Sequence, residues 1–143
     1  MNSSDISDFP YADSHESVRR DHANELAEDY VEAIHRIRLQ GKSPRVTDLQ
    51  HIFKVSHVTV IRTLKRLADK GLVFRSQKTG ISLTESGSIL ARKSAERHGL
   101  VVSLLRRLGV SEAQAQIDAE GLEHHFSDES LTAIQNFLED IDK

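Results

Sequence analysis

The sequence predicts a mainly α-helical protein with an N-terminal winged helix-turn-helix, a small β-hairpin wing, and an all-α second domain. Three observations predict it. A helix-turn-helix pattern over residues 47–71 is followed at once by two short strand patterns. Capping residues then open three further helical stretches. The charge changes sign between the two halves of the chain, which indicates two units with different tasks.

The N-terminal part contains one expected helix. Residues 1–20 are rich in Ser and Asp and lack apolar periodicity, so we expect a disordered N-terminal extension. A helix is expected from about Asn24 to Gln40, and Gly41 ends it. Its apolar stripe consists of Leu26, Tyr30, Val31, Ala33, Ile34 and Ile37.

Two short helices and a hairpin follow. The segment 47–50 has capping-box spacing and starts the first helix, residues 54–56 form the turn, and Ser56 caps the second, which ends at Gly71. Residues 72–75 and 81–83 read as strands joined by the polar loop 76–80. This order is typical of a winged helix, which we assign to residues 21–84.

The second domain is expected at residues 85–143 and consists of helices only. Thr84 caps a long helix that reaches about Leu108, Ser111 opens the next, and Ser127 caps the last. The helix that begins after Ser111 carries an acidic cluster that ends in two histidines.

Composition excludes several classes of protein. The chain has 143 residues and no cysteine, which excludes disulfides, iron–sulfur clusters and thiolate zinc sites. It has no apolar run long enough to span a membrane, and residues 1–22 lack the apolar core of a secretory signal. These features fit the cytoplasm and predict no membrane partner.

The middle of the chain is basic and its end is acidic. Between Arg45 and Lys78 there are eight basic residues and two acidic ones. Between Leu108 and Asp142 there are nine acidic residues and no Lys or Arg. The positive segment predicts an anionic partner, and the acidic segment attracts cations.

The second short helix is expected to read DNA. A helical wheel gathers Val60, Ile61, Leu64, Leu67 and Ala68 on one side and polar residues opposite. In a helix-turn-helix the start of that helix meets base edges, so Thr59 and Arg62 are candidates for base contacts and Val58 for a thymine methyl. The full candidate DNA-binding set is Ser56, His57, Val58, Thr59, Arg62, Lys65, Arg66, Arg75 and Lys78. The alternative is a solvated amphipathic helix.

A divalent metal is the expected cation. Read as one helix, Glu120, Glu123 and His124 lie at i, i+3 and i+4 and share a face, and Asp29 and Glu32 are similarly spaced upstream. Hard carboxylates with imidazole and no thiolate fit Mn(II) or Fe(II), and four carboxylates carry charge for two bridged ions. The alternative is an acidic helix surface that ends in two histidines.

In three segments the chain resembles the diphtheria toxin repressor family of metal-dependent bacterial repressors. They are Asp29–Glu32, Arg97–His98 and Asp118–His125, in that order and spacing. The resemblance implies a homodimer with a helical metal-binding and dimerisation domain, and metal ligands at Asp29, Glu32, His98, Glu120, Glu123 and His124. The iron-sensing branch has Met and Cys at the positions of Asp29 and Glu120, so the hard carboxylates here favour manganese. Gly99 is unusual within a helix and costs up to about 1 kcal/mol relative to Ala.

The expected function is therefore a cytoplasmic, Mn(II)-dependent transcriptional repressor of manganese uptake genes. We expect two Mn(II) ions per subunit, with Fe(II), Zn(II) or Cd(II) as substitutes, palindromic double-stranded operator DNA as the partner, and no small-molecule substrate. Alternatives are an iron-responsive regulator, a metal-independent winged-helix DNA-binding protein, and a carboxylate-bridged metalloenzyme.

Overall fold

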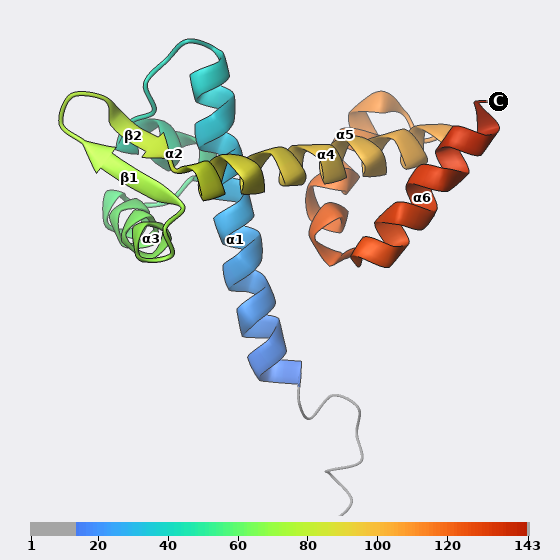
Figure 1. Ribbon diagram of the computed structural model, residues 1–143, viewed down its shortest axis with the longest axis horizontal. Helices are drawn as coiled ribbons and strands as arrows, with labels where there is room; N and C mark the ends of the chain where they lie inside the picture. The colour runs from blue at the N-terminus through green and yellow to red at the C-terminus, as the bar shows by residue number, and fades with distance from the viewer. Residues whose placement is uncertain (1–13, 143) are drawn as a thin grey trace, which may run out of the picture.

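The computed structural model describes residues 14–142, and in it one long helix, α4, joins two units (Figure 1). The N-terminal unit contains α1 (Ser14–Leu39), α2 (Val46–Phe53), α3 (His57–Asp69), β1 (Val73–Ser76) and β2 (Gly80–Leu83). The C-terminal unit contains α4 (Glu85–Arg107), α5 (Glu112–Leu122), the 3-10 turn η1 (Glu123–His125) and α6 (Asp128–Ile141). The predicted fold class, a winged helix-turn-helix followed by an all-α domain, is confirmed.

The first helix is longer than predicted. α1 begins at Ser14 rather than near Asn24, so residues 14–20, where a disordered extension was predicted, are helical. The remainder of the predicted extension, residues 1–13, lies outside the described residues. Tyr30, Val31 and Ile34 are buried, as the apolar stripe predicted. Gly41 ends the helix region in the left-handed conformation that glycine adopts at little cost.

The helix-turn-helix is confirmed, with one cap in a different place. The predicted capping box at 47–50 is wrong, because α2 begins at Val46 and the Arg45 N–H donates to Asp48 Oδ2 at 2.8 Å. Ser56 caps α3 as predicted, and its Oγ accepts from the Thr59 N–H at 3.2 Å. Ala68 is exposed, whereas Thr63 is buried and its hydroxyl donates to the Thr59 carbonyl.

The wing is an antiparallel hairpin that leads directly into α4. Val73 pairs with Leu83 and Ser76 with Gly80. The Thr84 hydroxyl accepts from the Gly87 N–H, which confirms the predicted cap. Gly87 allows a close approach, since an added Cβ would lie 2.0 Å from the Leu72 carbonyl oxygen. The hairpin and the start of α4 are therefore held together.

Two separate hydrophobic cores lie along α4. Ala91 belongs to the core of the N-terminal unit, together with residues of α1, α2, α3 and the hairpin. Val101 and Val102 belong to a second core, with Ala115 and Ala119 of α5. Between the two cores α4 presents Ser94 and His98, both buried polar residues. A polar site can therefore form where the two units meet.

The C-terminal unit differs from the prediction at the end of α5, while α4 is continuous as predicted. Glu120, Glu123 and His124 do not share one helix, because α5 ends at Leu122 and η1 carries the last two. α4 continues unbroken through Gly99, where an added Cβ would meet nothing within 4 Å. Across residues 14–142, no helix has the length and apolar character needed to cross a membrane.

Candidate metal centre

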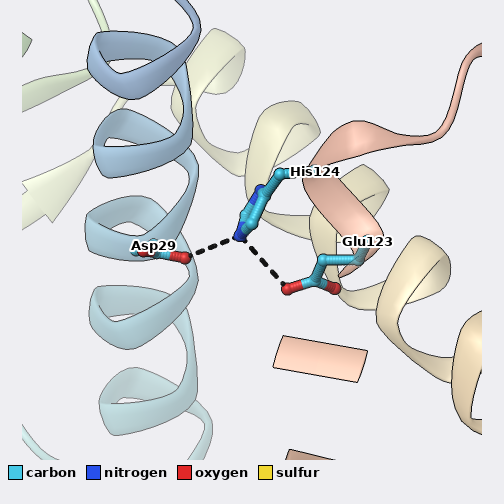
Figure 2. A group of neighbouring side chains, drawn as sticks. All are labelled: Asp29, Glu123 and His124. Carbon is cyan, nitrogen blue, oxygen red and sulfur yellow. Dashed lines mark ion pairs between the residues drawn. The ribbon is translucent and has the colours of Figure 1, made fainter. Parts of the chain in front are cut away.

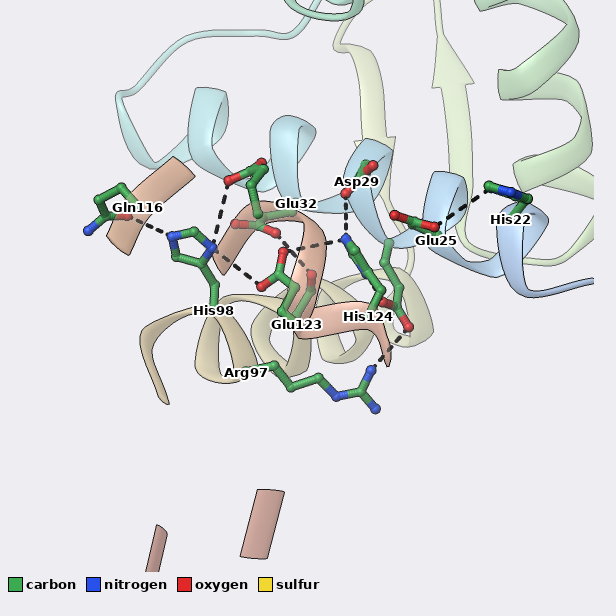
Figure 3. A network of polar contacts seen from close by, with 12 residues as sticks. His22, Glu25, Asp29, Glu32, Arg97, His98, Gln116, Glu123 and His124 are labelled. Carbon is green, nitrogen blue, oxygen red and sulfur yellow. Dashed lines mark hydrogen bonds and ion pairs between the residues drawn. The ribbon is translucent and has the colours of Figure 1, made fainter. Parts of the chain in front are cut away.

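A buried carboxylate, Glu123, lies at the middle of the site. Its side chain is 1% exposed, because the change from α5 to the tighter turn η1 directs it inward against α1 and α4. Its Oε2 lies 3.4 Å from His98 Nδ1, and its Oε1 lies 3.4 Å from His124 Nε2. Glu123 therefore faces one imidazole with each of its oxygens (Figure 3).

The first group of donors contains Asp29, Glu123 and His124. Asp29 comes from α1, and its Oδ1 lies 3.0 Å from His124 Nε2 (Figure 2). One ligand atom from each of the three residues lies within 4.8 Å of the other two. This is the spacing of a site that can hold one divalent cation.

The second group contains His98, Glu120 and Glu123. His98 Nδ1 lies 3.7 Å from Glu120 Oε2, in addition to its approach to Glu123. The Glu120 side chain is 61% exposed, so this side of the site opens toward solvent. Glu123 is shared by both groups.

Glu32 is close to the site but has other partners. It is buried, its Oε2 accepts from the Ser94 hydroxyl at 2.9 Å, and its Oε1 accepts from Arg36 at 2.5 Å. Its negative charge is the second cause of the raised pKa of Glu123, which places it within electrostatic reach. Figure 3 shows the Glu32 and Glu123 side chains next to one another.

The site contains buried polar atoms that lack hydrogen-bond partners. Among the described residues these atoms are His98 Nδ1, His124 Nε2 and both carboxylate oxygens of Glu123. A buried polar atom without a partner costs about 1–3 kcal/mol, so such atoms are rare in native proteins. Here the two imidazole nitrogens each lie 3.4 Å from one oxygen of Glu123, and cations bound between these atoms would satisfy them. The residues present therefore fit a divalent metal ion.

Two groups of the site, Glu123 and His124, have raised pKa values. Burial, followed by the nearby charge of Glu32, raises the pKa of Glu123 to about 8. The carboxylates of Asp29 and Glu28 raise the pKa of His124 to about 10. Near pH 7 both groups carry protons, which a bound cation would replace.

A surface pocket gives access to the carboxylates. It has a volume of about 530 Å³ and lies between α1, α2 and the end of α5. Asp29, Glu32 and Glu120 line it, together with Phe53 and other residues of α1 and α2. Solvent and a hydrated ion can therefore approach the oxygen donors from this side.

Three residues around the centre, Glu28, Ser94 and Gln116, were missed in the sequence, and Arg97 was named only as part of a motif. Glu28 Oε2 lies 2.7 Å from His124 Nδ1, and Gln116 Oε1 lies 2.7 Å from His98 Nε2. Ser94 donates a hydrogen bond to Glu32, and Arg97 forms an ion pair with Glu28. Helical spacing could have found two of them, because Glu28 precedes Glu32 by one turn and Gln116 precedes Glu120 by one turn. Tertiary contacts alone select Ser94.

The nine candidate DNA-binding residues are all exposed on the N-terminal unit. Val58 is 63% exposed, at the first turn of α3, and Arg62 follows one turn later. Lys78 lies in the turn between β1 and β2, and Arg75 lies on β1. Ser56 also has a structural task, because it caps α3 and its hydroxyl lies 3.0 Å from that of Thr59. The set thus lies on the start and outer face of α3 and on the wing.

Comparison with known proteins gives matches over most of the chain. Residues 23–81 match the family model "Iron dependent repressor, N-terminal DNA binding domain", and residues 84–143 match "Iron dependent repressor, metal binding and dimerisation domain". The chain is 39% identical to the transcriptional regulator MntR of Escherichia coli O157:H7, over 94% of this chain and 86% of that protein. It is 42% identical to MntR of Salmonella typhimurium, over 85% of this chain and 78% of that protein.

Solved structures share the arrangement of the helices. The manganese regulator SloR matches with a TM-score of 0.70 and 28% identity, over 79% of this chain. The chain spans about half of SloR, 53% of its length. A manganese-dependent transcriptional repressor in complex with manganese matches with a TM-score of 0.69 and 29% identity, over 78% of this chain and 52% of that one.

Proposed function

This chain belongs to the iron-dependent repressor family, the diphtheria toxin repressor family that its motifs resemble, and from that premise we propose its function. It is a manganese-dependent transcriptional repressor that binds operator DNA as a homodimer, and it is not an enzyme. It controls genes of manganese uptake and homeostasis, and it acts in the cytoplasm. The observation that carries the metal dependence is the set of unpartnered buried atoms on His98, Glu123 and His124.

The metal ligands we propose are the six residues expected from the sequence. Asp29, Glu123 and His124 would hold one ion, His98, Glu120 and Glu123 would hold a second, and Glu32 would complete the set. Carboxylate oxygens suit Mn(II), and the absence of thiolate or thioether donors among these residues removes the preference for softer ions. Fe(II), Zn(II) and Cd(II) are the proposed substitutes.

The mechanism depends on which elements supply the ligands. A bound cation supplies positive charge and fixed coordination directions. Asp29 and Glu32 lie on α1 of the N-terminal unit, whereas His124 and Glu123 lie on η1 of the C-terminal unit. Holding these side chains together would fix the angle between the units, at the junction of the two cores. In the homodimer this sets the distance between the two α3 helices.

That distance must match the operator. Two recognition helices of a symmetric dimer bind half-sites one helical turn of DNA apart, or multiples of it, so we propose a palindromic operator. Thr59 and Arg62, with Val58, read base edges, and Lys65, Arg66, Arg75 and Lys78 contact phosphates. We also propose that residues 21–84 form the DNA-binding domain and that residues 85–143 form the metal-binding and dimerisation domain.

The decisive experiment is binding of operator DNA with controlled metal. The full chain is freed of metal with EDTA and titrated into labelled duplex DNA, alone and with Mn(II), Fe(II), Zn(II) or Ca(II). We expect tight binding with Mn(II), and binding close to that of random DNA after EDTA. Equal binding with and without metal would support a metal-independent regulator, and a response to Fe(II) alone would support an iron-responsive one.

A further inference from the structure

We propose that Glu28 and Gln116 are positioning residues that fix the tautomers of His124 and His98. Neither is itself a metal ligand. On each imidazole the nitrogen that carries no proton then faces Glu123. The inference rests on the proposed metal site and deepens it. It assigns to two residues outside the ligand set the task of deciding which nitrogen binds the cation.

His124 is oriented from α1. Glu28 Oε2 lies 2.7 Å from His124 Nδ1, and an ionised carboxylate only accepts hydrogen bonds. In the neutral, metal-binding imidazole the single proton is therefore on Nδ1, and Nε2 keeps its lone pair. That nitrogen is buried, lacks a hydrogen-bond partner, and faces Asp29 and Glu123. The ring that Glu28 holds thus presents Nε2 to the site, and Figure 3 shows His124 between Asp29 and Glu123.

His98 is oriented from α5, in the opposite sense. Gln116 Oε1 lies 2.7 Å from His98 Nε2, while the Gln116 amide nitrogen donates to Glu112 Oε1 at 2.9 Å. Because that second bond uses the amide N–H, the amide oxygen is the atom that accepts from His98 Nε2–H. The lone pair then lies on Nδ1, which is buried, lacks a hydrogen-bond partner, and lies 3.4 Å from Glu123 Oε2.

Glu28 itself is held in place by Arg97, which also reaches α6. Arg97 Nη1 of α4 lies 3.3 Å from Glu28 Oε1, and Arg97 Nη2 lies 3.7 Å from Asp128 Oδ1 at the start of α6. Since Glu28 belongs to α1, the orientation of His124 depends on the contact between the N-terminal and C-terminal units. The hydrogen bond would therefore be present when the units are docked and lost when they separate.

The experiment measures the binding of Mn(II) to the full chain by calorimetry and by electron paramagnetic resonance of free Mn(II). The variants are Glu28→Ala, Glu28→Gln and Gln116→Ala. The matched controls are Glu25→Ala, on the same helix with its ion pair to His22, and Gln114→Ala, on α5 with its hydrogen bond to Asp118. Circular dichroism checks that each variant folds.

The expected result is a loss of Mn(II) affinity of about 10- to 100-fold for both alanine variants, the usual effect of removing a hydrogen-bond partner of a metal-bound histidine. Glu28→Gln keeps an accepting oxygen and should recover most of the affinity. The controls should change affinity by no more than about twofold, as substitutions away from a site usually do. Equal affinities for Glu28→Ala and Glu25→Ala would overturn the proposal.

A second readout tests the tautomers directly. Proton–nitrogen spectra of the histidine rings, recorded with the diamagnetic ion Zn(II), should show a protonated Nδ1 on His124 and a protonated Nε2 on His98. If Asp29→Ala abolishes metal binding while Glu28→Ala leaves affinity and spectra unchanged, this inference fails and the proposed function stands. If the unaltered chain binds no Mn(II), both fail.

Discussion

The Asp29 carboxylate of α1 lies 3.0 Å from Nε2 of His124, so the first helix contacts the η1 turn of the second unit here. The approach is close, the His124 side chain is 3% exposed, and its Nε2 still lacks a hydrogen-bond partner in proper geometry. The pair therefore joins the DNA-binding and metal-binding units through a carboxylate oxygen and an imidazole nitrogen that could both bind a cation.

Replacing Asp29 with Ala should uncouple DNA binding from metal. Coupling between two sites is typically about 1–3 kcal/mol, and most of it should disappear when α1 loses this ligand. Fluorescence anisotropy of operator DNA, with and without saturating Mn(II), measures the coupling. Asp21→Ala, an exposed carboxylate on the same helix, is the control. The assignment of Asp29 as a ligand is wrong if Mn(II) raises the DNA affinity of Asp29→Ala as much as that of the parent.

Stabilisation by Mn(II) should increase with pH. Glu123 has a pKa of about 8 in the folded chain, against an ordinary value of 4.5. Without metal, the stability that this raised pKa contributes is complete below about pH 4.5 and is lost as pH rises to about 8. The pKa of His124, about 10, adds a contribution that is complete below about 6.5 and lost as pH rises toward 10. Metal binding displaces these protons and so becomes more favourable at high pH.

Thermal unfolding at several pH values tests this. The rise in Tm caused by a fixed excess of Mn(II), relative to EDTA, should be larger near pH 8 than near pH 6. Glu123→Gln, which removes the group with the raised pKa, should flatten the pH dependence of the Tm measured in EDTA. A rise in Tm that is the same at both pH values would contradict the protonated state of the metal-free site.

Glu120→Cys should change the preferred metal. Glu120 is the exposed donor of the His98 group, so a thiolate fits there without disturbing the buried Glu123. Thiolate favours softer ions, and activation should shift from Mn(II) toward Zn(II). Activation curves of DNA binding with each ion measure the shift, with Asp118→Cys, an exposed carboxylate on the same helix, as control. An unchanged Mn(II) response would remove Glu120 from the selectivity of the site.

The two kinds of DNA contact should separate by mutation. Arg62 is exposed one turn into α3, so Arg62→Ala should cost about 1–3 kcal/mol on operator DNA and far less on random DNA. Lys78 lies in the wing turn, so Lys78→Ala should weaken both about equally and lower the salt slope by about one per subunit. Both are measured at saturating Mn(II). Equal losses on the two DNAs for Arg62→Ala would disprove its role in reading bases.

The sequence alone was sufficient for most of the elements and for the donor types of the site. Local signals act within a few residues, so the caps at Ser56, Thr84 and Ser127 and the strands of the hairpin were placed correctly. The donor types Asp, Glu and His without Cys are also a property of the chain itself, and they indicated a hard divalent metal before any fold was known.

The tertiary structure decided how the donors are arranged. Helical spacing predicted one face for Glu120, Glu123 and His124, but the chain changes from α5 to η1 at Glu123 and divides them between two donor groups. Glu28, Ser94 and Gln116 entered the site only because α1, α4 and α5 pack together there. Burial, which raises the pKa of Glu123 and leaves its oxygens without partners, is likewise a result of packing between elements distant in sequence. Local pattern selects residue types, whereas distances and desolvation depend on contacts that local pattern does not contain.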